Sequence, residues 1–264
     1  MAAAQGGAAL VDPASIVYKP QRGETVTGTV RLSNPGTTAL GLRLYVSDWT
    51  MNMTGQFEFA DPGTLERSAS TWLSLPASKV ELGPRESRAI DYTLSVPEDA
   101  TDGTHWTVIF AESEPTAPEP GQPTAAISVR VGHIVYVNLP GYESAGEVLG
   151  LFGDPPAEPG RPYTVVAHYA NGGNVAQSVA GSFTLRNSRG EVVRDAEIER
   201  SIVLPASERL FIIDVYGPLE PGNYTALVVL NYGDEERDVA GSLDLTLDEA
   251  LTTTAGTDPA DDGR

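Results

Sequence analysis

Short segments in which apolar and polar residues alternate recur along nearly the whole chain. Thr25–Asn34 is typical, with Val30 and Leu32 set between polar neighbours, and Gly41–Trp49 and Ile90–Val96 follow the same pattern. A period of two places successive side chains on opposite faces of a β-strand. No long stretch has the i, i+3, i+4 pattern of an amphipathic helix. The sequence therefore predicts an all-β protein without a long helix.

The two halves of the chain share one order of motifs. Each half has a strand that ends in an Asn-x-Gly sequence, at Asn34 and at Asn171. Each then has a turn that begins at a leucine and leads into a strand, at Leu82–Arg88 and at Leu204–Arg209. A Pro…Gly turn before an aromatic-led strand follows in both halves. A repeat of this length indicates duplicated domains rather than a solenoid.

Short strands at regular spacing, with turns between them, are the sequence signature of a β-sandwich. We therefore expect two tandem immunoglobulin-like Greek-key β-sandwich domains. The Pro-rich segment Ser113–Thr124 is expected to be a hairpin loop of the first domain. The expected order is an N-terminal extension (1–13), a first domain (14–140), a second domain (141–248) and a disordered acidic tail (249–264).

The charge balance excludes several classes of partner. With 17 Lys and Arg against 36 Asp and Glu, the net charge of the 264 residues is −19. Phosphate groups are repelled by such a chain, so nucleic acids and anionic membrane surfaces are not expected partners. There is no cysteine, which removes disulfides, thiolate catalysis and Cys-based zinc sites.

The termini and the apolar runs bear on localisation. No apolar run approaches the roughly 20 residues that span a bilayer, so no membrane insertion is expected. The Ala-rich start, Met1–Gln5, resembles what remains after a secretory signal has been removed, with a Met added. We expect a secreted protein of the periplasm or the cell exterior.

Catalytic and metal-binding motifs are not found. The three histidines, His105, His133 and His168, lie in separate predicted strands without metal-ligand spacing. Asp99–Gly103 has two carboxylates before a glycine but lacks the later acidic ligand of an EF-hand. The sequence therefore predicts no catalytic residues, no metal site, no cofactor and no enzymatic activity.

Residues 15–140 resemble the N-terminal domain of periplasmic pilus chaperones of the chaperone–usher type. The resemblance begins at Ile16–Tyr18 and runs through Val26–Asn34 and Trp49. It continues through Trp72–Pro76, Val80–Ser87, Val96–Asp99 and His105–Trp106, and it ends with the alternating segment Ile127–Val137 before Asn138–Pro140. The resemblance implies a two-domain, non-enzymatic chaperone.

Members of this family bind pilus subunits whose own sandwich lacks a strand, and they lend the last strand of their first domain. Main-chain hydrogen bonds then supply affinity, and alternate side chains supply specificity. The resemblance thus implies partner subunits with an exposed β-edge or an incomplete sandwich. It places the partner-binding residues in one strand, namely Ile127, Val129, Val131, His133 and Val135 on one face and Arg130 on the other.

The sequence departs from the family at its basic anchor pair. Members use an Arg near the first strand and a Lys in the last strand to hold the subunit's terminal carboxylate. Here Ala14 or Ser15 stands in place of the Arg, and His133 stands in place of the Lys. A neutral residue and a weakly basic one predict a poor carboxylate clamp.

Two functions remain open at this point. The first is a periplasmic chaperone-like protein that binds pilus or surface-structure subunits by strand addition. The alternative is a structural or adhesive cell-surface module that binds a wall component or another surface protein. Leu204–Arg209 and Leu219–Tyr224 also look like the second domain of Gram-positive surface proteins. Exposed tryptophans at Trp49, Trp72 and Trp106 would favour the module, and buried ones would count against it.

Overall fold

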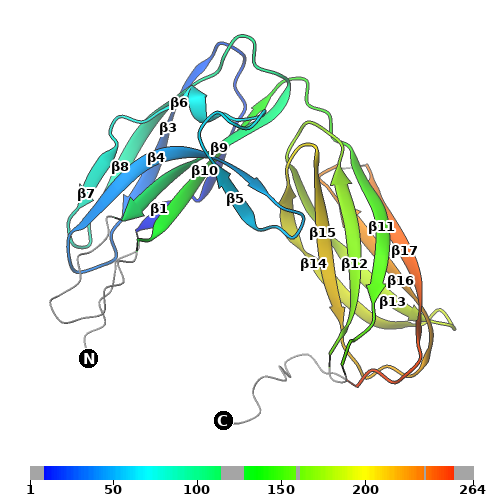
Figure 1. Cartoon of the computed structure of the whole chain (residues 1–264). Helices are drawn as coiled ribbons and strands as arrows, with labels where there is room; N and C mark the ends of the chain where they lie inside the picture. The colour runs from blue at the N-terminus through cyan, green and yellow to red at the C-terminus, as the bar shows by residue number, and fades with distance from the viewer. Residues whose placement is uncertain (1–8, 114–127, 159–160, 235, 253–264) are drawn as a thin grey trace. The chain divides into compact units, whose positions relative to one another are not determined.

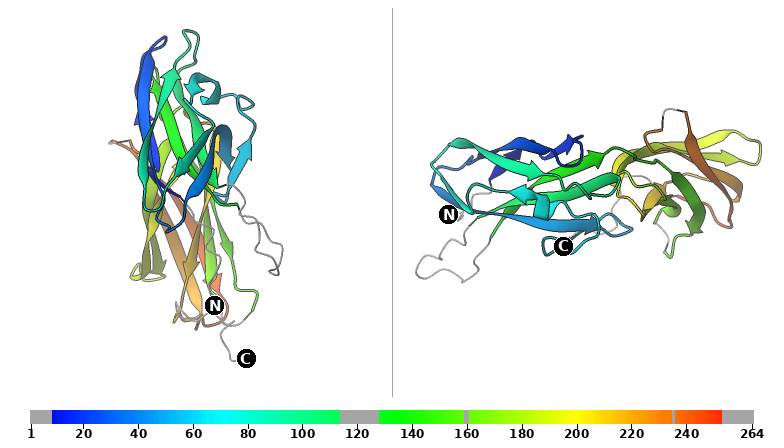
Figure 2. Two further views of the ribbon diagram at one scale, coloured as in Figure 1. Left: turned by 90° about the vertical axis from the view of Figure 1, so that its left-hand side faces the viewer. Right: turned by 90° about the horizontal axis from the view of Figure 1, so that it is seen from above.

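The fold is all-β, as the alternating pattern predicts. The computed structural model describes residues 9–113, 128–158, 161–234 and 236–252. Within these ranges the only helical element is a single 3-10 turn, η1 (Ser70–Trp72). The strands form two compact units, each with two layers of strands (Figure 1, Figure 2). The first unit comprises Met1–Thr50 and Phe57–Tyr142, and the second comprises Met51–Gln56 and Glu143–Arg264.

The first unit pairs a four-stranded sheet with a six-stranded one. The smaller sheet has the order β1 (Leu10–Asp12), β3 (Thr25–Ser33), β8 (Ser87–Ser95) and β6 (Leu73–Ser74). The larger sheet has the order β2 (Ser15–Tyr18), β10 (Arg130–Leu139), β9 (Gly103–Ser113), β4 (Leu40–Met51) and β5 (Phe57–Ala60), and β7 (Lys79–Leu82) pairs with the start of β4.

The core of the first unit lies between these two sheets. Strand alternation puts every second side chain inward, and in β10 these are Val135, Val137 and Leu139, all fully buried. They pack with inward residues of β3 and β8 such as Leu32 and Leu94. The inward face of β10 is therefore committed to the unit's own core over this part of the strand.

The second unit is a seven-stranded immunoglobulin-like sandwich with its own core. Its fourth strand, β14, pairs with the third strand rather than with the fifth. One sheet has the order β11 (Gly146–Asp154), β12 (Tyr163–Asn171) and β15 (Ser207–Val215). The other has the order β14 (Val192–Val203), β13 (Gln177–Asn187), β16 (Gly222–Asn231) and β17 (Asp238–Leu247).

The two motifs of the internal repeat meet in space in each unit. The buried amide of Asn34 donates to the carbonyls of Thr38, Leu82 and Gly83 at 2.8, 3.3 and 2.9 Å. Its Oδ1 accepts the N–H of Gly36. One side chain thus ties the Asn-x-Gly turn to the leucine turn.

The second unit repeats this network around Asn171. Its amide donates to the carbonyls of Val175, Val203 and Leu204 at 2.9, 3.0 and 3.0 Å. Its Oδ1 accepts the N–H of Gly173 at 3.0 Å. The sequence repeat therefore corresponds to a repeated buried hydrogen-bond network.

Parts of the two expected terminal segments belong to the folded units. In the segment expected to be an extension, Ala9 is buried and Leu10–Asp12 form β1, paired with β3. In the segment expected to be a disordered tail, Leu251 is buried in the second core and exchanges backbone hydrogen bonds with Leu219. An isolated leucine carries no periodicity, which explains why the pattern missed it. The expected hairpin loop of the first domain falls mostly on residues 114–127, outside the described ranges.

Candidate partner-binding edge

Strand β10 is paired along its whole length on one side but only partly on the other. All ten residues, Arg130–Leu139, pair with β9 in antiparallel fashion. On the opposite side only Ile134–Val137 pair, in parallel, with Ser15–Tyr18 of β2. Within the described ranges no strand pairs with the part of β10 before Ile134 on that side, and β1, which contacts β10, pairs with β3 instead. Figure 1 shows β9, β10 and the neighbouring strands of this sheet.

The backbone groups at this open edge belong to Arg130 and Gly132. Neighbouring residues of an antiparallel strand direct their N–H and C=O groups alternately to the two sides. Ser113 donates to the carbonyl of Val129 at 2.9 Å, whereas the N–H of Ile134 points to the other side and donates to the carbonyl of Ala14 at 2.9 Å. The N–H and C=O groups of Arg130 and Gly132 therefore face the side without a strand.

The pairing between β10 and β2 ends where the chain passes from β1 in one sheet to β2 in the other. β1 pairs with β3 in one sheet and β2 pairs with β10 in the other, so the chain crosses at Pro13 and Ala14. The His133 Nδ1–H donates to the carbonyl of Pro13 at 2.7 Å. This bond and the one from Ile134 to Ala14 fix the crossing beside the middle of β10. They define where the open edge ends.

His133 belongs to a buried chain of hydrogen bonds. Because its Nδ1–H is used by Pro13, its Nε2 accepts the hydroxyl of Tyr92 at 3.0 Å. The hydroxyl of Tyr18 lies 3.1 Å from that of Tyr92 and donates to it. Burial lowers the pKa of His133 below its usual range, and the bond to Pro13 opposes this in part. The imidazole is therefore neutral at pH 7.

The two positions of the family's anchor pair do come together, but without a cation. Ser15 pairs with Ile134, next to His133, and His133 is fully buried and neutral. No lysine or arginine side chain occupies either position. The weak carboxylate clamp expected from the sequence stays a prediction.

The apolar residues predicted to bind a partner face the core. His133 and Val135 are fully buried, whereas Val129 and Val131 are half-buried nearer the open end of the sandwich. A small apolar void of about 10 Å³ lies beside Val131 and His133. Ile127 lies outside the described residues. On this face only Val129 and Val131 keep part of their surface exposed.

Arg130 lies on the opposite face of β10 and is exposed. Its guanidinium carbon sits 4.4 Å from the ring centre of Phe59 and 4.7 Å from that of Phe110. Its cross-strand neighbour Glu112 instead accepts a 2.6 Å hydrogen bond from Arg43. That bond holds the pKa of Glu112 below its usual range. Arg130 is thus held by two aromatic rings rather than by this carboxylate.

A second apolar layer covers the outer face of the same sheet. Trp49 and Trp106 are buried there, and the Trp106 Nε1–H donates to the carbonyl of Trp49 at 2.7 Å. Phe57 and Phe59 of β5 stack in parallel over this layer, 6.1 Å apart, and are 51% and 41% exposed. The sequence analysis missed these two phenylalanines. Their alternation in Phe57–Ala60 was the available signal.

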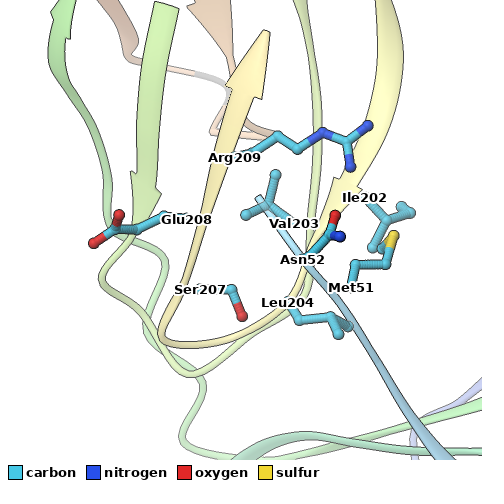
Figure 3. A pocket seen from close by; sticks show the side chains of 8 residues that line it. All are labelled: Met51, Asn52, Ile202, Val203, Leu204, Ser207, Glu208 and Arg209. Carbon is cyan, nitrogen blue, oxygen red and sulfur yellow. The ribbon is translucent and has the colours of Figure 1, made fainter. Parts of the chain in front are cut away.

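The described part of the chain has one wide surface pocket, of about 510 Å³, which lies in the second unit and is lined by residues of 187–194 and 218–224. The described ranges hold no group of three His, Asp or Glu residues that could bind a metal ion. Figure 3 shows a pocket of the second unit that has a volume of only about 10 Å³. The pocket in Figure 3 is lined by Met51, Asn52, Ile202, Val203, Leu204, Ser207, Glu208 and Arg209.

No helix in the described ranges is long and apolar enough to cross a membrane.

No protein-family model matches the sequence, and no curated protein matches it. Among solved structures, the chain is similar to one from a chaperone–tip adhesin complex of CFA/I fimbriae, with 14% identity, coverage of 92% and 100% of the two chains and a TM-score of 0.48. It is also similar to the CupB2 chaperone of Pseudomonas aeruginosa, with 14% identity, coverage of 92% and 100% and a TM-score of 0.45.

A third similar structure is the complex of the SafA pilin with the SafB chaperone of Salmonella enterica. It has 12% identity, coverage of 89% and 96% of the two chains and a TM-score of 0.45. The likeness to pilus chaperones noted in the sequence is thus also found among solved structures, over about nine-tenths of the chain.

Proposed function

We propose that this protein is a periplasmic chaperone-like protein that binds partner polypeptides by β-strand addition at the open edge of β10. The partners are subunits of a pilus or of another surface structure, with an exposed β-edge or an incomplete sandwich of their own. Their class comes from the sequence resemblance of residues 15–140, and the binding mode comes from the pairing of β10.

The observation that carries the proposal is the one-sided pairing of β10 before Ile134. Unpaired N–H and C=O groups at a sheet edge form a template for another strand. A partner strand beside Arg130 and Gly132 would continue the sheet until it meets β2 at Ser15. The added strand is therefore short on this edge, and it extends toward the residues that precede β10.

Side chains on both faces of β10 support the same binding mode. Val129 and Val131 keep partial exposure on the core side, where a partner's inward residues would pack. On the outer side, Arg130 is held over Phe59 and Phe110 and presents a cation beside the open edge. A partner strand with an acidic or polar residue on its outer face would match this cation.

The alternative, a surface module that binds wall polymer, has weaker support. A sugar-binding platform needs exposed aromatic faces, yet Trp49 and Trp106 are buried and Trp72 is half-buried. Trp106 also uses its indole N–H within the protein. The exposed aromatic side chains of this face are Phe57 and Phe59, which have no polar group to bind a sugar hydroxyl.

The test compares Arg130→Pro with Arg130→Ala in a pull-down from the envelope extract of the source organism. Proline removes the N–H that faces the open edge and leaves the bonds to β9 intact, because those belong to the odd-numbered residues. Alanine removes the guanidinium but keeps that N–H. A substitution of Val131 would not separate partner binding from folding. Val131 packs against the core, so an aspartate at this position would destabilise the fold.

The proposal predicts that the wild type recovers a subunit with an incomplete sandwich, that Arg130→Ala recovers somewhat less because the cation is lost, and that Arg130→Pro recovers much less than Arg130→Ala. Equal recovery by all three proteins would contradict strand addition at this edge. Retention of wall polymer alone would favour the surface module.

A further inference from the structure

The outer face of the β11–β12–β15 sheet in the second unit carries exposed apolar side chains in one row. Alternation in β12 buries Val165 and Ala167 and turns Val166 outward. The strand register places Phe152, Val166 and Ile212 side by side across the three strands. Figure 1 shows these strands next to one another.

This row exposes more apolar surface than single surface residues do. Phe152 is 57% exposed and Ile212 is 59% exposed, and they flank the half-buried Val166. A Cβ on Gly150 would lie 3.4 Å from the Phe152 ring, so the ring lies over a glycine rather than over a side chain. Isolated exposed apolar residues are normal, but a contiguous set marks an interaction surface.

Carboxylates border the row on both sides. On one side, the next cross-strand row contains Asp154, Thr164 and Asp214, and the Thr164 hydroxyl donates to Asp214 at 2.9 Å. On the other side the next row contains Gly150, His168 and Leu210, and His168 Nε2 lies 2.7 Å from a carboxylate oxygen of Glu208 in the row beyond it. The outward-facing residues of these three strands include no lysine or arginine. The row is therefore apolar with an acidic rim.

We propose that this acidic-rimmed row binds an extended polypeptide segment in which bulky apolar side chains alternate with lysine or arginine. The apolar side chains would cover Phe152, Val166 and Ile212. The basic side chains would reach Asp154 and Asp214 at the rim. The inference is independent of the β10 edge, which lies in the other unit.

The probe is the labelled peptide Lys-Phe-Lys-Ile-Lys-Phe-Lys, titrated with the full chain and followed by fluorescence anisotropy. The matched peptide with Glu in place of Lys tests the charge. The variant Phe152→Thr/Ile212→Thr removes the exposed row and keeps strand-forming residues. Val192→Thr is its control, because Val192 is also exposed, at 48%, but lies in β14 of the other sheet.

A second pair of variants separates the rim from the overall negative charge. Asp214→Asn removes a rim carboxylate that is bonded to a threonine on the neighbouring strand. Asp244→Asn removes an equivalent carboxylate, bonded to Thr225 at 2.7 Å, from the other sheet. Both variants change the net charge equally.

The proposal predicts that the basic peptide binds and that the double variant weakens binding roughly ten-fold, whereas Val192→Thr does not. Asp214→Asn is expected to weaken binding roughly two-fold or more, and Asp244→Asn is not. Equal binding of both peptides, or unchanged binding by the double variant, would overturn the proposal. It would also be overturned if wild type were a dimer that the double variant dissolves, because the row would then be a self-association surface.

Discussion

The buried asparagines, Asn34 and Asn171, are the residues that most directly connect the sequence repeat to stability. Each amide caps the carbonyls of a turn far away in sequence. Replacing one with alanine leaves several buried carbonyls without a donor, which costs free energy for each one. These carbonyls belong to the leucine turns that the sequence analysis found beside them in the repeat.

We expect Asn34→Ala to lower the free energy of unfolding of the first unit by about 2–4 kcal/mol. Tryptophan fluorescence during urea denaturation measures this directly, since the three tryptophans, Trp49, Trp72 and Trp106, all lie in the first unit. Ser33→Ala is the control, because its hydrogen bond to Ser87 is exposed, and it should change stability by less than about 0.5 kcal/mol.

We expect two buried histidines to make the first unit less stable in mild acid. Burial lowers the pKa of His133 and of His105, with a smaller opposing contribution from a backbone hydrogen bond in each case. The unfolded imidazoles take up protons below about pH 6.5, where the folded ones stay neutral. The unfolded state then binds more protons, so stability is full above pH 7 and falls as the pH drops below about 6.5.

The expected slope is at most about 1.4 kcal/mol per pH unit for each histidine. Denaturation at pH 7.5, 6.5 and 5.5, followed by tryptophan fluorescence, tests this expectation. His133→Gln should make the slope shallower, because it removes one of the two buried groups that take up a proton on unfolding. A His133→Gln protein with the wild-type slope would show that His133 does not carry the pH dependence.

At the scale of the element, one side of β10 is paired with β2 over Ile134–Val137 and is not paired with a described strand before Ile134. Arg130 and Ile134 both direct their N–H to that side, but among the described residues only Ile134 has an acceptor there, the carbonyl of Ala14. The same substitution at the two positions should therefore have different consequences for stability.

We expect Ile134→Pro to destabilise the first unit by about 3 kcal/mol, because it breaks the pairing with β2 and removes a half-buried side chain. Arg130→Pro should cost less than about 1 kcal/mol relative to Arg130→Ala, because no backbone bond is lost. Urea denaturation of the three variants gives the comparison. Similar losses from both prolines would mean that the N–H of Arg130 is bonded in solution.

The sequence could identify β10 as a strand but not its second neighbour. The alternation of Val131, His133 and Val135 predicts which residues share a face, and the structure places that face toward the core. The pairing of Ser15 with Ile134 joins segments that are far apart in sequence, so no local pattern encodes where it stops. The placement of Arg130 over Phe59 is equally non-local.

At the scale of the whole molecule, the all-β class and the duplication could be read from the sequence because both follow local rules. Period-two alternation fixes the strands, and the repeated Asn-x-Gly and leucine turns fix the duplication. The open edge follows from the change of sheet between β1 and β2. It is a property of the assembled first unit, which explains why the alternating pattern could suggest a donated strand but could not delimit it.

The central claim, that the first half of β10 is an open edge, is tested most directly by amide hydrogen exchange of the isolated protein, resolved by residue with NMR. The account predicts fast exchange at Arg130 and Gly132 and slow exchange at Val131 and His133, whose N–H groups face β9. An alternating pattern of this kind marks a strand that is paired on one side only. Uniformly slow exchange from Arg130 to His133 would mean that the edge is already covered, and it would contradict the proposed binding mode.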